Sequence, residues 1–263
     1  MKSILSMSAC LLVLVLLAIA PASGITVSGI ALVTDVSPGE QIIFNMTADA
    51  GDVSEPVDVE ANVIAFTHDL ECNRVIIPDN ETSPYTARDF LKVTPERATI
   101  EPGDKVVFTL EGIVPEDVGD GGRYALVGIS TVPSGNETVG FSSGVDVPVF
   151  LTIAGSEIIE TGEIIGLNLS EGDNGGLVAD VLFENTGNHH YKASAEFVLK
   201  DDEGNIVEEF VYSKTGCSIL PSTKRGCAMP VGSDLAPGSY TVEVSVIKQD
   251  GTMLDTKEAT IEL

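Results

Sequence analysis

The residues of this sequence that could do chemistry are three histidines, a few cysteines and several acidic turns. His189 and His190 are adjacent and follow a turn-forming Asn, so we expect them to be solvent-exposed turn residues. Neighbouring residues of a strand point to opposite faces, so the pair cannot easily bind one metal ion. His68 stands far from both. The sequence has no Gly-x-Ser-x-Gly elbow, His-Glu-x-x-His helix or phosphate-binding loop. We therefore expect no enzyme, no cofactor and no resident metal.

Acid-rich turns are the remaining suggestive feature: Asp117 with Asp120, Glu171 with Asp173, and Asp201 with Asp202 and Glu203. None has the spacing of a calcium-binding loop. Asp is also common in turns because its side chain hydrogen-bonds the local backbone. We interpret these runs as turns, with calcium binding as the less favoured alternative.

The N-terminus has the pattern of a secretory signal peptide. Lys2 is followed by the apolar run 10–19, and small residues follow from Ala20 to Gly24. Residues 1–23 are therefore expected to be removed. The alternative is an uncleaved anchor, but the run is short for the ~20 residues of a membrane span. No second apolar run follows, so we expect a secreted, extracellular protein, free or associated with the cell surface, whose mature chain has no membrane span.

The cysteines that remain after cleavage should meet oxidising conditions. Cys217 and Cys227 lie ten positions apart in the same half of the chain, and we expect them to form a disulfide. Cys72 is then the odd thiol, buried or idle.

The net charge of −26 makes nucleic acid and anionic membrane unsuitable partners, because like charges repel. A surface of this kind fits a protein that faces high salt, where the self-repulsion is screened. It also fits cation binding at an acidic cell surface.

The elements that must position these residues are strands. Apolar and polar residues alternate with period two in segments 57–63, 105–111, 145–153, 177–184, 191–199 and 240–246. This pattern is typical of half-buried antiparallel strands, and turn residues separate the segments at regular intervals. The sequence therefore predicts an all-β fold of immunoglobulin-like sandwiches. The stretch Ala154–Glu157 breaks the pattern, which divides the chain into a first sandwich (25–153) and a second (156–263) of common domain size.

The two halves share a weak internal similarity. In each, a Pro turn precedes a strand, and a Gly-containing turn then leads to a tyrosine, Tyr124 or Tyr240, at the head of another strand. A tyrosine in this position can bury its ring and hydrogen-bond back to the preceding corner, as in the tyrosine corner of Greek-key sandwiches. The alternative is that any two β domains share such turns.

The first half, from Val36-Ser37-Pro38-Gly39 through Leu91-Lys92-Val93-Thr94-Pro95 to Gly122-Arg123-Tyr124, resembles the PapD-like immunoglobulin domains of microbial surface proteins. Among these it looks most like the WxL-interacting proteins. The second half, with 183–188 and 235–240, is similar to their second sandwich. The resemblance implies an exported protein that binds surface partners. Those proteins usually end in a membrane anchor, and this sequence stops at Leu263, so the resemblance does not extend to tethering. The basic residues with which pilus chaperones grip a subunit cannot be placed, so chaperone activity is not carried over.

Four Asn-x-Ser/Thr sequons, at Asn45, Asn80, Asn136 and Asn168, are candidate glycosylation sites of an exported chain.

The sequence favours a non-catalytic interaction or structural protein of the cell envelope that binds a surface protein or a wall polymer. The alternative is a secreted assembly factor, chaperone-like in action, or a carbohydrate-binding module. The absence of Trp and the aromatic content of 5% make sugar binding less favoured. We expect recognition at free sheet edges, with the terminal strands 25–36 and 253–263 as candidates. The alternative is that these strands complete their own sandwiches.

Overall fold

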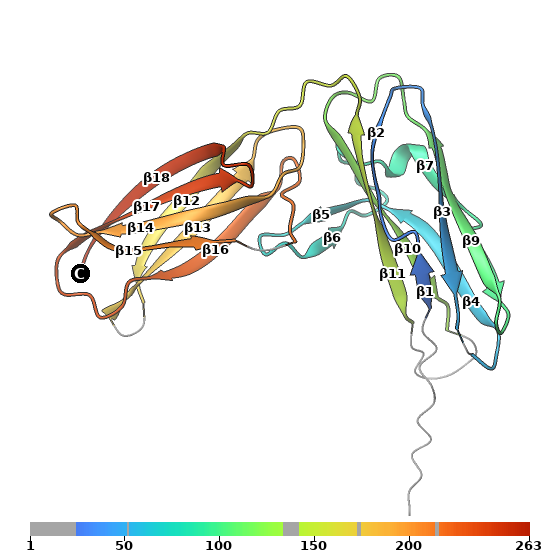
Figure 1. Ribbon diagram of the computed structural model, residues 1–263, viewed down its shortest axis with the longest axis horizontal. Helices are drawn as coiled ribbons and strands as arrows, with labels where there is room; N and C mark the ends of the chain where they lie inside the picture. The colour runs from blue at the N-terminus through green and yellow to red at the C-terminus, as the bar shows by residue number, and fades with distance from the viewer. Residues whose placement is uncertain (1–24, 52, 134–141, 173–174, 214–215) are drawn as a thin grey trace, which may run out of the picture.

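The computed structural model describes residues 25–263, except 52, 134–141, 173–174 and 214–215. The described residues form antiparallel and parallel strands and one short 3-10 turn, η1 (Arg88–Phe90) (Figure 1). The predicted all-β sandwich fold is confirmed, whereas the predicted signal peptide lies outside the described residues. None of the described helical segments has the length and apolar character needed to cross a membrane. We keep the predicted division and name residues 25–153 the first sandwich and 156–263 the second.

The first sandwich has two main sheets. One contains, in spatial order, β1 (Thr26–Ser28), β3 (Gln41–Asp49), β9 (Lys105–Ile113) and β7 (Leu91–Thr94). The other contains β2 (Leu32–Val36), β11 (Gly144–Ile153), β10 (Gly122–Thr131), β4 (Val57–Ile64) and β8 (Arg97–Ile100). The apolar sets that the sequence alternation predicted face each other across the sheets, with Phe108, Leu110 and Ile129 fully buried between them.

The opening segment passes from one sheet to the other. β1 pairs with β3, and β2 then pairs in parallel with β11 in the second sheet. Gly29 lies between them with a φ of +79°, and a side chain there would collide with the carbonyl oxygen of Asn45. Only glycine readily satisfies both conditions. Gly29 therefore marks the point at which the opening segment changes sheet.

The second sandwich also has two sheets. One contains β12 (Gly162–Glu171), β13 (Leu177–Asn185) and β16 (Lys224–Val231). The other contains β15 (Ile206–Tyr212), β14 (Ala193–Lys200), β17 (Ser239–Lys248) and β18 (Met253–Glu262). Phe197 is buried between the sheets and its ring stacks on Phe210 at 4.9 Å between centroids.

The C-terminal strand β18 is an edge in pairing, but its open side is covered by β12. Asp255 Oδ2 accepts a hydrogen bond of 2.7 Å from the backbone N–H of Ile164, and Lys257 Nζ donates one of 3.0 Å to the carbonyl of Ile164. Two side chains of β18 therefore satisfy the backbone of its neighbour. This closure supports the interpretation that the C-terminal strand completes its own sandwich.

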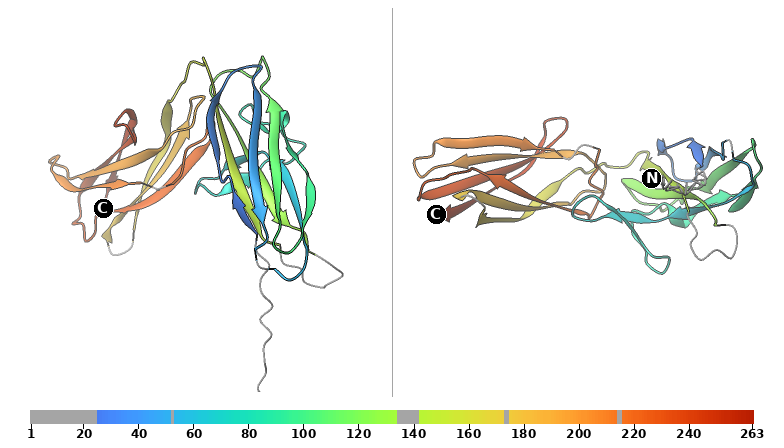
Figure 2. Two further views of the ribbon diagram at one scale, coloured as in Figure 1. Left: turned by 45° about the vertical axis from the view of Figure 1, so that its right-hand side comes forward. Right: turned by 90° about the horizontal axis from the view of Figure 1, so that it is seen from below.

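A hairpin projects from the first sandwich. It consists of β5 (Phe66–His68) and β6 (Arg74–Ile76), which pair antiparallel. The two sandwiches lie at an angle to each other, and this hairpin spans the space between them (Figures 1 and 2). The sequence did not predict this hairpin, which directs the tip 69–72 at the second sandwich.

Candidate functional site at the junction of the two sandwiches

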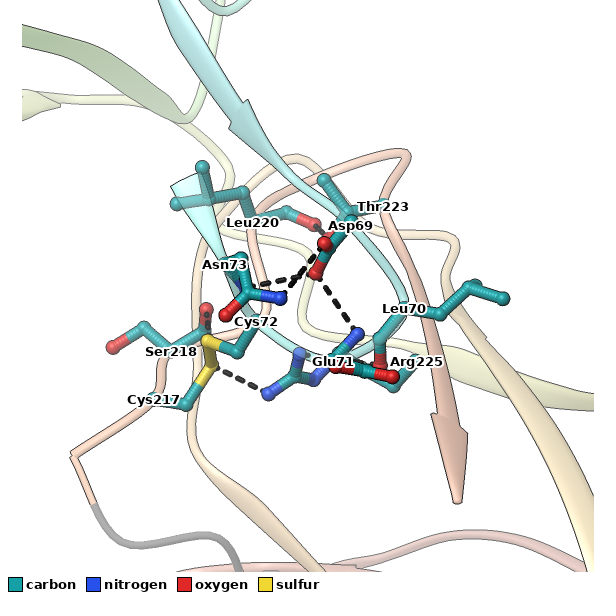
Figure 3. The surroundings of a disulfide bond; sticks show 10 residues. All are labelled: Asp69, Leu70, Glu71, Cys72, Asn73, Cys217, Ser218, Leu220, Thr223 and Arg225. Atoms are coloured by element: carbon teal, nitrogen blue, oxygen red, sulfur yellow. Dashed lines mark hydrogen bonds between the residues drawn. A yellow bond between two sulfur atoms is a disulfide. The ribbon is translucent and has the colours of Figure 1, made fainter. Parts of the chain in front are cut away.

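A disulfide joins the hairpin tip to the second sandwich. Cys72 is bonded to Cys217, with 6.5 Å between their Cα atoms and 145 positions between them in the sequence (Figure 3). The predicted pairing of Cys217 with Cys227 is therefore wrong, and Cys72 is not an idle thiol. Cys227 lies within β16 opposite Val181, whereas Cys217 precedes β16 in the segment that meets the hairpin.

Cys227 is the free cysteine of the described residues. Burial, and then the nearby carboxylate of Asp180, raise the pKa of this thiol to about 11. Since the thiolate is the reactive form, Cys227 is a poor nucleophile at neutral pH.

Backbone hydrogen bonds and one arginine support the disulfide. The N–H of Gly226 donates to the carbonyl of Leu70 at 3.0 Å. The Arg225 guanidinium donates to Sγ of Cys217 at 2.6 Å. The carboxylate of Asp69 accepts hydrogen bonds from two backbone N–H groups of the tip, which shapes the turn (Figure 3). The tip is therefore hydrogen-bonded both within itself and to the second sandwich.

His68 belongs to the same cluster. Potential ligand atoms of His68, Cys72 and Cys217 lie within 4.8 Å of one another, the one such group of three in the described part of the chain. Both sulfurs are in the disulfide, however, and only a thiolate binds a metal strongly. Burial and the positive charge of Arg225 lower the pKa of His68. The cluster therefore joins the sandwiches and is no metal centre in this state.

The adjacent histidines are not exposed turn residues, which corrects the prediction. The side chain of His189 is only 16% exposed, and its Nδ1 lies 3.0 Å from Glu160, which also accepts a 2.9 Å bond from Lys248. Burial opposes the charge of Glu160, but the hydrogen bonds from Lys248 and His189 outweigh it and lower the pKa of this carboxyl. The ring of His190 packs at 4.9 Å from that of Phe150 in the first sandwich.

Tyr124 connects the two sandwiches through its hydroxyl. The hydroxyl accepts a 3.0 Å hydrogen bond from the backbone N–H of His190 and lies 3.2 Å from Nδ1 of the same residue. Tyr124 therefore does not form the tyrosine corner that its position allows. Tyr240 does form it, since its hydroxyl donates to the carbonyl of Ala236 at 2.9 Å.

Asn188 lies at the junction, although the sequence predicts only that it forms part of a turn. Its side chain accepts from the N–H of Ile159 at 2.8 Å and donates to the carbonyl of Glu157 at 2.8 Å. Its own carbonyl accepts from the N–H of Gly122 at 2.9 Å. Asn188 is therefore hydrogen-bonded both to the segment between β11 and β12 and to Gly122 of the first sandwich.

Apolar side chains complete the junction. Phe66, Tyr124 and Leu126 of the first sandwich form a buried cluster with Leu220 of the second. As a result, β10 is buried on both faces, whereas its neighbours β11 and β4 alternate between buried and less buried residues. The disulfide, the hydrogen bonds and the apolar contacts thus all join the first sandwich to the second at this junction.

A groove lies beside the hairpin tip, on the side of the second sandwich where β15 and β16 are the edges of opposite sheets. Its volume is about 590 Å³. The wall comes from both sheets and the hairpin and is largely apolar: Leu70, Phe183, Tyr212, Ile219, Cys227 and Met229. The junction therefore includes a hollow surface to which both sandwiches contribute.

The remaining predicted residues lie apart from this junction. Asn45, Asn80 and Asn168 are exposed, Asn136 lies outside the described residues, and glycosylation at all four stays a prediction. Of the acidic runs, Asp201 accepts backbone hydrogen bonds from Glu203 and Asn205, at 3.0 Å and 2.7 Å. It therefore acts as a turn residue.

No family model and no curated protein matches this chain. Solved structures similar to it include the class 5 fimbriae chaperone CfaA, at 12% identity and a TM-score of 0.44 over 91% of this chain and 98% of that chain. The E. coli chaperone DraB is similar at 14% identity and a TM-score of 0.43, over 90% of this chain and 97% of that chain. The Pseudomonas aeruginosa CupB2 chaperone is similar at 15% identity and a TM-score of 0.37, over 90% of this chain and 100% of that chain. The resemblance to WxL-interacting proteins stays a prediction.

Proposed function

We propose that this chain is an exported, non-catalytic protein that binds another exported protein and assists its assembly. It does so by offering free sheet edges of the second sandwich to an extended segment of that partner. The observation that carries the proposal is the open side of this sandwich, where β15 and β16 are both edge strands. The inter-sandwich disulfide supports export, because such bonds persist in oxidising compartments.

The edge strand β15 is largely apolar. Ile206, Val207 and Val211 are 58%, 46% and 61% exposed, and the acidic pair Glu208 and Glu209 between them is exposed as well. Apolar edges recruit other strands, and the two carboxylates favour partner segments that carry positive charge. An edge of this kind suits strand addition, in which the main chain provides affinity and the side chains provide specificity.

The carbohydrate-binding alternative has less support. None of the large apolar side chains exposed in the described residues is aromatic. Among the described residues, aromatic side chains are either buried or, like Tyr212, half-buried, so none offers a sugar ring a fully exposed face.

A photo-crosslinking experiment tests the proposed function in the producing cells. A benzophenone amino acid replaces Val207 on the β15 edge, and a control variant carries it at Ile43, which is 63% exposed on the first sandwich. We expect an adduct with one exported protein from position 207 and none from position 43. Equal adducts at both positions, or none at either, would overturn the proposal.

A further inference from the structure

We infer that the groove between β15 and β16 is a composite site for one extended segment of the partner protein, apolar at alternate positions and basic at its flanks. The inference rests on the proposed function and specifies where and what it binds. Both sandwiches build the site, because Leu70 of the hairpin closes one end.

The free edge of β16 can be located residue by residue. The N–H of Gly226 donates to Leu70, so it points away from the paired strand β13. Residues two apart in an antiparallel strand direct their backbone groups to the same side. The N–H and C=O of Ala228 therefore face the groove side as well. Pro230 follows at the next such position and has no N–H to offer, as is typical of an edge.

Leu70 already occupies one position along this edge. Its carbonyl takes the Gly226 N–H, and its side chain lies over Gly226, where an added Cβ would meet Leu70 Cβ at 3.4 Å. The hairpin tip thus makes one hydrogen bond of the kind that an added strand would continue at Ala228. The site of the partner segment is continuous with a contact that the protein makes to itself.

The groove suits apolar side chains. Phe183, Tyr212 and Met229 line it, and its volume of about 590 Å³ lies in the range of ligand pockets. An extended segment directs every second side chain to one face, so alternate apolar residues would fill the groove while the others face solvent.

The negative charge around the groove favours a partner segment with basic residues at both ends. Asp180 lines it, and Glu208 and Glu209 are exposed on the neighbouring strand. The one lining arginine, Arg225, is engaged by Cys217 Sγ and by the Leu70 carbonyl at 3.5 Å. Carboxylates without a matching cation attract Lys or Arg side chains of a partner.

The test uses a labelled nine-residue synthetic peptide of alternating valine and threonine with lysine at both ends, titrated into the full mature chain. We expect saturable one-to-one binding. Ala228→Pro should weaken it about 3- to 10-fold, as for one lost hydrogen bond, and Ala228→Ser, which keeps the N–H, should not. Equal affinity of the proline variant and the wild type would overturn the inference.

Two peptide controls keep the test valid if Ala228→Pro misfolds. A peptide with alternate amides N-methylated keeps its side chains but loses main-chain donors, and it should bind at least about 3-fold more weakly. A peptide with aspartate flanks should also bind more weakly, increasingly so as salt is lowered. Equal binding of all three peptides would overturn strand addition at this site.

Dodecanoate, a fatty acid, is used as a competitor to test the alternative that the groove binds an acyl chain. Displacement of the peptide by micromolar dodecanoate would assign the groove to an acyl chain and overturn the inference. If no peptide binds while the crosslink at position 207 persists, the groove assignment fails and the proposed function stands. If peptide binding is seen without any crosslink in cells, the proposed function fails instead.

Discussion

The hydroxyl of Tyr124 in the first sandwich and the backbone N–H of His190 in the second are hydrogen-bonded at 3.0 Å, across 66 positions of sequence. The Tyr124 ring is buried, and the hydrogen bond itself is part-buried. Tyr124→Phe removes the acceptor and leaves the His190 N–H without this partner. We expect the free energy of unfolding to fall by about 1–3 kcal/mol, measured by urea denaturation. Tyr240→Phe, which breaks a bond inside one sandwich, is the control, and only Tyr124→Phe should also change the angle between the sandwiches in X-ray scattering.

The disulfide should matter more than any single junction hydrogen bond. A loop of 145 residues separates its cysteines, so the loop-entropy model gives a stabilisation of about 4–5 kcal/mol. We expect Cys72→Ser and Cys217→Ser to lower the melting temperature equally, and reduction to have no further effect on either. Cys227→Ser should melt like the wild type and remain sensitive to reduction. A loss of stability in Cys227→Ser alone would contradict the pairing.

His190 should make stability depend on pH. Burial, and then the charge of neighbouring His189, lower the pKa of His190 to about 4 from the 6.5 of an unperturbed side chain. The unfolded chain therefore binds more protons between these values, so this stabilisation is complete above pH 6.5 and is lost as the pH falls towards 4. Melting curves at pH 7.0, 5.5 and 4.5 should show a shallower decline for His190→Gln than for the wild type. Equal slopes would show that His190 does not titrate in this way.

Gly121 and Gly155 form a matched pair for the junction. Both have positive φ, +89° and +81°, but a side chain at Gly121 would also collide with Asn188, whereas Gly155 has open space. Gly155→Ala should cost about 1–2 kcal/mol from backbone strain alone. Gly121→Ala should cost clearly more and should weaken the contact with Asn188, visible as faster amide exchange at Gly122. Identical costs would mean that the sandwiches separate freely.

Salt should stabilise the protein. A net charge of −26 repels itself, and a Debye length near 10 Å at 0.1 M leaves much of this repulsion unscreened. We expect the melting temperature to climb from low to molar NaCl. A flat series would show that the carboxylates are already compensated.

The strands themselves were predictable because their signal is local. In segment 145–153, for example, alternate residues from Val145 to Ile153 face the core, as the alternation required. The Tyr240 corner was predictable for the same reason, since its partner Ala236 lies four residues away. The β5–β6 hairpin escaped prediction because three-residue strands carry almost no periodicity.

By itself, the sequence determined an all-β chain of sandwiches with buried alternating faces, an acidic surface and no recognisable catalytic motif. Only the tertiary structure decided which cysteine Cys217 meets, where the Tyr124 hydroxyl points and that the adjacent histidines lie in a junction. The physical reason is the separation in sequence between the residues that determine each feature. Alternation is dictated by the two-residue repeat of a strand, whereas these contacts join elements 66 to 145 positions apart whose meeting depends on the packing of whole sheets.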